Sequence, residues 1–168
     1  MKLESPDGRF FTLNVDGYEF PDEKLGPTED NPADEFESGR FLIVSHTFCN
    51  SDGEWCASGA TMTTSELQRL ADWLESIRDG NVSQSGVYFT ERDLEFTVDD
   101  SGSILRVHVF GNFLPSWIGQ VDAITIDFPV ACVQFDRVLK SLRRQLTQFP
   151  GRPPIQNVTE PADDREPE

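Results

Sequence analysis

The sequence predicts an α+β fold in which a mainly antiparallel β-sheet carries two amphipathic helices on its apolar face. Short alternating segments separated by turn residues predict the strands. Two longer segments, within residues 63–80 and 131–149, repeat apolar side chains with helical spacing. The chain has 168 residues, of which 37% are hydrophobic and 13 are Phe, so it can build one core without disulfides or metals.

The first strand is predicted over Phe10–Val15 and is expected to stop at Asp16-Gly17. Tyr18 and Phe20 alternate after this turn, and we expect both rings to pack onto the core or to cover it. This stretch is therefore interpreted as a structural corner. An acidic segment without strand or helix pattern follows at residues 22–40, and loops of this length are often functional or disordered.

A hairpin with strands at Phe41–Cys49 and Glu54–Thr61 is predicted next, with Asp52-Gly53 as its two-residue turn. Counting outward from that turn places Cys49 opposite Cys56, in a hydrogen-bonded pair with the wider Cα spacing. Three cysteines without framework spacing also fit a reducing compartment. We therefore predict that Cys49 and Cys56 are free thiols.

The first helix is predicted from a capping box, in which Thr63 precedes Glu66 by three residues, and Gly80 supplies its end. Its apolar stripe consists of Leu67, Leu70, Ala71, Leu74 and Ile77. Further strands are predicted at residues 87–89, 94–98, 103–110 and 121–128. The second helix is predicted from Ala131 to about Phe149, with a stripe of Phe135, Val138, Leu139, Leu142 and Leu146.

Residues 1–152 are predicted to form a single globular domain that includes the acidic loop at residues 22–40. The remaining residues, 153–168, are acidic and rich in Pro, which predicts a disordered tail. The first residues contain no apolar signal region, and no segment approaches the length of a membrane span. We therefore expect a cytoplasmic protein without membrane contact.

The net charge of the chain is -16, and its sequence pI is about 4.3. Nonspecific binding to nucleic acid requires the opposite sign, so this class of function is excluded. A basic protein partner is favoured instead, with an association rate that falls as salt is added.

Few residues suggest catalysis or metal binding. The two His and three Cys have no ligand spacing, and no phosphate loop precedes a helix, so we predict neither a metal site nor a cofactor. Glu91 and Asp93 lie in a turn before a strand, where they could cap the strand or act as an acid–base pair. No nucleophile lies in a glycine-framed turn, and we predict no catalytic residues.

Trp117 lies in residues 114–118, a loop between two predicted strands. An exposed Trp beside acidic residues is typical of a binding hot spot. Trp side chains also serve as lids on their own core, since Trp is seldom left wholly exposed. Both interpretations of Trp117 are open on the sequence alone.

Several landmarks of the chain occur together in a known family. They are Asp7-Gly8, residues 17–21, Gly53-Glu54-Trp55, residues 62–67, Trp73-Leu74, residues 89–96, Pro115-Ser116-Trp117 and residues 145–152. In these landmarks the chain resembles the WapI family of bacterial immunity proteins, from about Leu3 to Arg152. The resemblance implies a small cytosolic antitoxin, not an enzyme, that binds the toxic C-terminal domain of a large secreted protein. In the best-known system of this kind the toxin cleaves tRNA.

The chain differs from the usual family pattern at Glu19, at residues 91–93 and in the acidic insert around residues 28–37. The resemblance therefore does not identify which toxin this chain binds. As partner-binding residues we predict one Trp and the acidic loop: Asp22, Glu23, Glu29, Asp30, Asp34, Glu35, Glu37 and Trp117. The predicted partner is a basic protein toxin domain, for which a nuclease is one candidate. Two alternatives are an acidic protein-interaction module of another role and, third, a carboxylate-dependent hydrolase.

Overall fold

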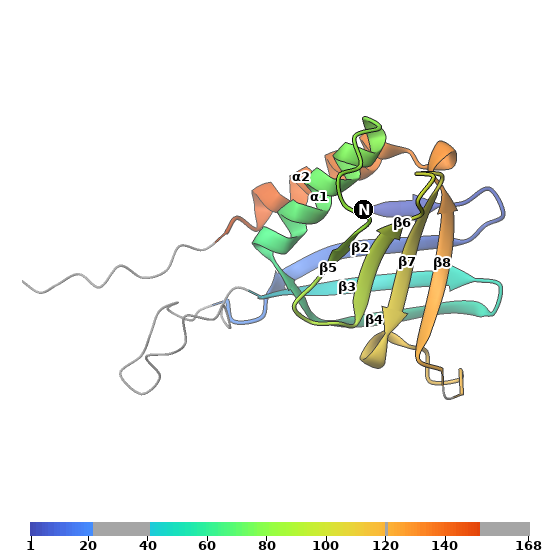
Figure 1. Cartoon of the computed structure of the whole chain (residues 1–168). Coiled ribbons are helices and arrows are strands. Elements are labelled where there is room, and N and C mark those ends of the chain that lie inside the picture. The colour runs from blue at the N-terminus through green and yellow to red at the C-terminus, as the bar shows by residue number, and fades with distance from the viewer. Residues whose placement is uncertain (22–40, 120, 152–168) are drawn as a thin grey trace, which may run out of the picture.

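The computed structural model describes residues 1–21, 41–119 and 121–151. Its strands form two antiparallel four-stranded sheets, and two helices lie side by side at one end of them (Figure 1). The predicted α+β class with antiparallel strands and two helices is confirmed. The division of the strands between two sheets is an additional feature that the alternation of residues did not reveal.

The first sheet contains four strands in the order of the chain, and so does the second. The first consists of β1 (Lys2–Glu4), β2 (Phe10–Tyr18), β3 (Phe41–Asn50) and β4 (Gly53–Thr63). The second consists of β5 (Gly86–Tyr88), β6 (Leu94–Val98), β7 (Ile104–Phe110) and β8 (Ala123–Pro129). The helices are α1 (Thr64–Arg78) and α2 (Phe135–Gln148), and short 3-10 helices follow β7 (η2, Gly111–Phe113) and β8 (η3, Val130–Cys132). None of the described helices is long and apolar enough to cross a membrane.

Strand β2 continues past the predicted turn, so the expected end at Asp16-Gly17 is wrong. Val15 pairs with Val44 and Gly17 with Ile43, which leaves Asp16 as the extra residue of a β-bulge. The Tyr18 ring meets Phe149 edge-on, and its hydroxyl donates to the Pro150 carbonyl at 2.5 Å. Tyr18 therefore ties the end of β2 to the end of α2.

The β3–β4 hairpin turns one residue earlier than predicted. Its turn is Ser51-Asp52, so Asn50 pairs with Gly53, and Cys49 lies opposite Glu54 instead of Cys56. The pairing is displaced by two residues, and an even displacement leaves every side chain on its predicted face. The cysteines are free, as predicted.

Helix α1 begins and ends where the sequence places its signals. The Thr63 hydroxyl accepts the Glu66 amide at 3.2 Å, and the Glu66 carboxylate accepts the Thr63 amide at 2.9 Å, which completes the capping box. At the other end Gly80 adopts a φ of +70°, and its amide donates to Ile77 in a Schellman motif. Helix α2 begins at Phe135 instead of Ala131, because residues 130–132 form η3.

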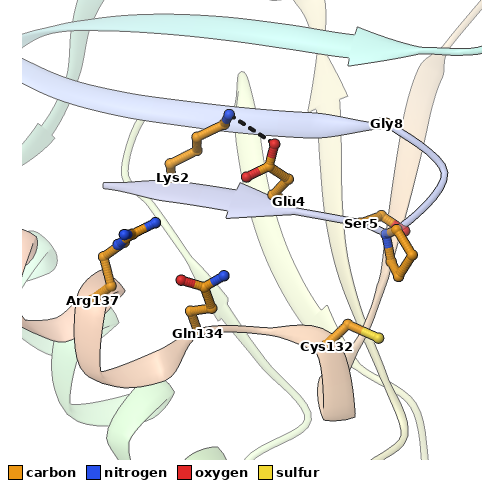
Figure 2. Close-up of a pocket in the computed structure, with 8 residues that line it drawn as sticks. Lys2, Glu4, Ser5, Gly8, Cys132, Gln134 and Arg137 are labelled. Atoms are coloured by element: carbon orange, nitrogen blue, oxygen red, sulfur yellow. Dashed lines mark hydrogen bonds and ion pairs between the residues drawn. The ribbon is translucent and has the colours of Figure 1, made fainter.

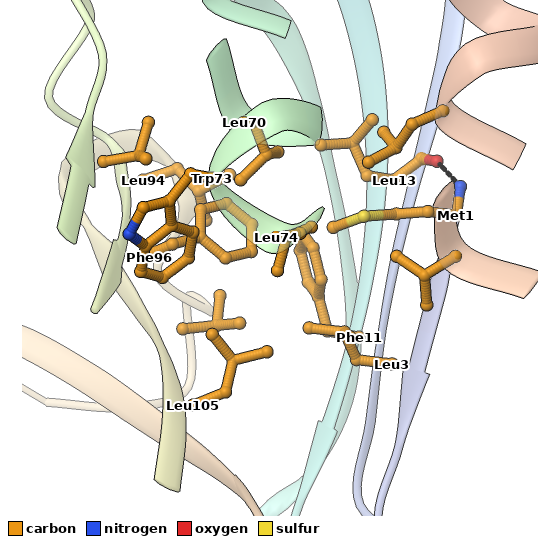
Figure 3. Close-up of a cluster of buried hydrophobic side chains, with 14 of the residues drawn as sticks. Met1, Leu3, Phe11, Leu13, Leu70, Trp73, Leu74, Leu94, Phe96 and Leu105 are labelled. Atoms are coloured by element: carbon orange, nitrogen blue, oxygen red, sulfur yellow. Dashed lines mark hydrogen bonds between the residues drawn. The ribbon is translucent and has the colours of Figure 1, made fainter. Parts of the chain in front are cut away.

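The core fills the space between the two sheets and beneath α1 (Figure 3). Phe11 from β2 and Phe96 from β6 meet edge-on with their ring centroids 5.6 Å apart. Leu70 and Leu74 of α1 are completely buried in the same cluster. This shared core joins both sheets to α1, and it supports the loops at the end of the sheets away from the helices.

Candidate partner-binding surface

Trp117 lies on the surface between η2 and β8, and 55% of its area is exposed. Its ring meets the Trp55 ring edge-on, at 6.2 Å and 87°. A side chain at Gly53 would lie 3.6 Å from the Trp117 ring, so this ring also covers the tip of the β3–β4 hairpin. The two interpretations of Trp117 are therefore both partly true, because one edge rests on the core and more than half of the ring faces solvent.

Trp55 gives this surface a rigid base. It is 6% exposed, stacks on Phe48 with ring centroids 5.0 Å apart, and donates its Nε1–H to the Phe113 carbonyl at 2.9 Å. Phe113 is itself buried and contacts His46 at 4.8 Å between ring centroids. The loop that carries Trp117 joins β7 to β8 of the second sheet, and buried aromatic side chains attach it to β3 and β4 of the first.

Exposed carboxylates flank Gly53, the residue that the Trp117 ring covers, and another follows Trp117 in the sequence, without cations nearby in the chain. Asp52 and Glu54 flank Gly53, and both are exposed. Asp122 is exposed as well, next to Val121, which is 43% exposed. The chain contains no Lys or Arg from residue 41 to 68 or from residue 107 to 136. This absence of cations is the sequence signal that could have singled out Asp52, Glu54 and Asp122 as unpaired carboxylates.

The other seven predicted partner-binding residues cannot be placed against Trp117. Asp22, Glu23, Glu29, Asp30, Asp34, Glu35 and Glu37 lie outside the described residues, as does the predicted tail at 153–168. These two stretches, residues 22–40 and 152–168, contain 12 of the 30 acidic and 4 of the 14 basic residues. They therefore carry half of the net charge, and their part in binding stays a prediction.

Of the two carboxylates considered for acid–base chemistry, Glu91 is exposed and Asp93 has a structural partner. Glu66 is the one buried carboxylate in the described part of the chain, and it accepts the Thr90 amide at 2.8 Å and the Thr90 hydroxyl at 2.9 Å. Asp93 accepts the Asn112 amide at 3.2 Å, and a side chain at Gly111 would collide with its carboxylate. Glu66 and Asp93 thus fix the turns around β5–β6 and η2.

The two histidines occupy different environments. His46 is buried on the core face of β3, as predicted, and burial lowers its pKa to about 3. Its ring stacks on both Phe11 and Phe48, which also contact each other. His108 is half-buried on β7, between the hydroxyls of Thr97 at 2.7 Å and Thr125 at 2.9 Å, and burial lowers its pKa too. No group of His, Cys, Asp and Glu with metal-binding geometry occurs in residues 1–21, 41–119 and 121–151.

Two hollows lie away from Trp117. One, of about 390 Å³, is bounded by the N-terminal strand and the start of α2, and its lining contains a Lys2–Glu4 ion pair of 3.0 Å and the Arg137 side chain (Figure 2). The other, of about 440 Å³, is lined by Tyr88, Phe89, Arg92, Leu94, Glu95 and Phe110. Neither includes a residue predicted to bind the partner.

The molecule is thus an α+β domain with an exposed tryptophan on a rigid acidic surface, which is the chemistry of a protein-binding hot spot. It belongs to the immunity protein WapI-like family, whose model matches residues 2–150. No curated protein and no solved structure shows significant similarity to the chain. Membership of this family confirms the resemblance and suggests a toxin immunity protein with a non-enzymatic role.

Proposed function

We propose that this protein binds and neutralises the C-terminal toxin domain of a secreted polymorphic toxin, and that it acts in the cytoplasm. The observation that carries the proposal is the family match over residues 2–150. An immunity protein protects its own cell by occupying the toxin, so it needs a rigid complementary surface and no catalytic groups of its own. The fixed aromatic base under Trp117 supports this role.

The proposed partner is a basic domain, and a nuclease is the leading candidate for it. A nuclease presents Lys and Arg to phosphate groups, so dense carboxylates on an inhibitor match its active surface. The charge of -16 and the cation-free stretches around Trp117 favour such a partner. Complementary charges of this kind raise the association rate, and the gain falls with added salt.

The proposed contact residues are Trp117 and the acidic segment, which is defined here as residues 22–40. Trp117 would supply apolar contact area, because large aromatic side chains dominate the free energy of binding at hot spots. The acidic segment would supply long-range attraction, with seven carboxylates against two cations. Asp52 and Glu54 add charge on either side of Gly53, which the Trp117 ring covers.

The first experiment is calorimetric binding of this chain to the C-terminal domain of the large secreted protein encoded next to it, at two salt concentrations. We expect a Kd in the nanomolar range that weakens with salt. A growth assay with both proteins co-expressed tests protection directly. Absence of both binding and protection would contradict the proposal and leave an acidic interaction module with a different partner.

A further inference from the structure

Each sheet exposes two edge strands, and the four edges differ in length and protection. β1 and β5 contain three residues each, and Arg69 donates to the Tyr88 carbonyl of β5. β8 has seven residues and ends in Asp127 and Pro129, which discourage pairing with another strand. β4 has eleven residues and contains no Pro, Lys or Arg. Among the described strands, the edge of β4 is therefore the longest and carries the fewest residues that discourage pairing.

The register shows which backbone groups of β4 face outward. In a hairpin closed by a two-residue turn, the closing pair Asn50–Gly53 is hydrogen-bonded, and hydrogen-bonded pairs then alternate along the ladder. The residues between these pairs direct their N–H and carbonyl groups to the free edge. They are Glu54, Cys56, Ser58 and Ala60. Within the described ranges, no backbone hydrogen bond joins β4 to any element other than β3.

The same residues leave room for another chain. Glu54, Cys56 and Ser58 are exposed, and from Ala57 to Ala60 every side chain is small. The pairing with β3 is regular from Gly53 to Ala60, and the irregularity comes only beyond it, between Leu42 and Ile43 on β3. Eight consecutive residues thus form an edge without a bulge, which favours strand addition.

The core side of β4 is held in place, so the edge is preorganised. Phe113 packs under Gly59, where an added Cβ would lie 3.6 Å from its ring, and its carbonyl accepts the Trp55 Nε1–H. Trp117 covers the Gly53 end of the strand. A fixed edge lowers the entropic cost of binding an incoming strand.

We propose that β4 is the docking edge for an extended segment of the toxin domain, which adds a fifth strand to the first sheet. The inference rests on the proposed function, since it takes the toxin as the partner. The segment carries a Lys or Arg at the Gly53 end, where the exposed Asp52 and Glu54 flank Gly53, the residue that the Trp117 ring covers, and no basic residue is near in sequence. Such a cation pairs with the carboxylates and with the face of Trp117.

A second copy of this chain is the less favoured occupant of the edge. Self-pairing of β4 would bring two chains of charge -16 together, and each would present the same carboxylates. The repulsion between like charges opposes that dimer, whereas a basic segment gains from the same field. The oligomeric state of the free protein tests this point: a monomer is expected, and a dimer paired through β4 would overturn the proposal.

The decisive variant is Ser58→Pro, with Ser58→Ala as its matched control. Proline is tolerated on an edge strand where the lost N–H faced outward, so the β3–β4 ladder stays intact. The ring removes one donor and obstructs an incoming strand, so we expect the affinity for the toxin domain to fall at least about tenfold. Ser58→Ala keeps the backbone donor and should bind like the wild-type chain. Unchanged binding by folded Ser58→Pro overturns the proposed edge.

Hydrogen exchange on the wild-type chain tests the same edge without any substitution. The amides of Cys56, Ser58 and Ala60 should exchange fast in the free protein and become protected in the complex. Amides that stay fast in a bound complex overturn the edge proposal and leave the immunity function intact. If the wild-type chain does not bind the toxin domain at all, the proposed function fails, and the edge proposal fails with it.

Discussion

The carboxylates at one end of the molecule are paired with cations, whereas exposed carboxylates at the other end are not. At the end covered by the helices, cations neutralise the carboxylates: Glu75 accepts Arg143 at 2.6 Å and pairs with Arg78 at 2.9 Å, and Arg78 also pairs with Asp79. At the other end, which carries η2 and Trp117, the exposed carboxylates of Asp52, Glu54 and Asp122 form no ion pair with any described residue.

The difference separates charge that serves the fold from charge available to a partner. The hydrogen bond from Arg143 lowers the pKa of Glu75, which shows that its ionised form is satisfied within the chain. Carboxylates without an internal ion pair break none when a partner's cation approaches, and they increase the attraction at a distance. The Trp117 end is therefore the better candidate for binding, and the helical end is the better candidate for stability.

Replacing Trp55 should give the largest effect, because it removes the base of the binding end. Trp55→Ala deletes a buried ring stacked on Phe48 and leaves the Phe113 carbonyl without its donor. We expect the free energy of unfolding to fall by about 3–5 kcal/mol. Urea denaturation measures the loss. Trp55→Phe keeps a stacked ring but loses the hydrogen bond and part of the buried ring, so we expect a smaller loss, of about 1–3 kcal/mol.

Replacing Trp117 should separate binding from stability. Trp117→Ala removes a ring that is 55% exposed, and we expect at least about thirtyfold weaker toxin binding with a change in stability of less than about 1 kcal/mol. Tyr88→Ala is the matched control, because Tyr88 is 57% exposed and lines a hollow that does not include Trp117. Equal affinities for both variants and the wild-type chain would assign Trp117 to the fold alone.

Acid should lower the free energy of unfolding through His46, a buried core residue of β3. Its pKa of about 3 lies below the ordinary value, so the unfolded chain binds a proton that the folded chain excludes. This contribution to stability is complete above about pH 6.5 and is lost as the pH falls. Between pH 7 and pH 5 we expect a loss of about 2 kcal/mol from His46.

His46→Leu should flatten this part of the stability profile, as measured by urea denaturation at several pH values. The pKa of His108 is lowered as well, so His108→Asn serves as the control and gives the contribution of the second histidine. A slope between pH 7 and pH 5 that survives in His46→Leu would show that another group carries the acid sensitivity.

Local signals predicted most of the helices and strands, because helix caps, alternating apolar residues in strands and apolar stripes on helices each depend on a few neighbouring residues. The capping box at Thr63 and the Schellman end at Gly80 are complete within the helix they delimit. β1 was missed because three residues, Lys2–Glu4, are too few for a periodic pattern, and they depend on pairing with β2. The bulge at Asp16 was missed because Asp-Gly is also a strong turn signal.

The candidate site was harder to predict because it is assembled from distant parts of the chain. Trp117 and Trp55 are 62 positions apart, and their contact depends on Phe113 bridging the sheets. Sequence patterns identify an unusual Trp but do not show what supports it. The unprotected edge of β4 depends equally on the order of strands, which places β3 on one side only.

Neutralising the acidic segment should give the smallest effect, and it should appear in kinetics instead of stability. We expect the combined change of Glu29, Asp30, Asp34 and Glu35 to their amides to slow association with the toxin domain about tenfold at low salt, because long-range attraction sets the encounter rate. Stopped-flow association at two salt concentrations measures it, and the dissociation rate should change little.

The matched control for this variant removes the same charge elsewhere: Glu160, Asp163, Asp164 and Glu166 are changed to their amides. Both variants carry four fewer negative charges than the wild-type chain. If only the first slows association, the segment at residues 22–40 contributes to steering by its position. If both variants slow association equally, net charge alone steers the encounter. The direct contacts with the toxin are then assigned to Trp117 and β4. Unchanged association in the first variant would remove the acidic segment from the interface.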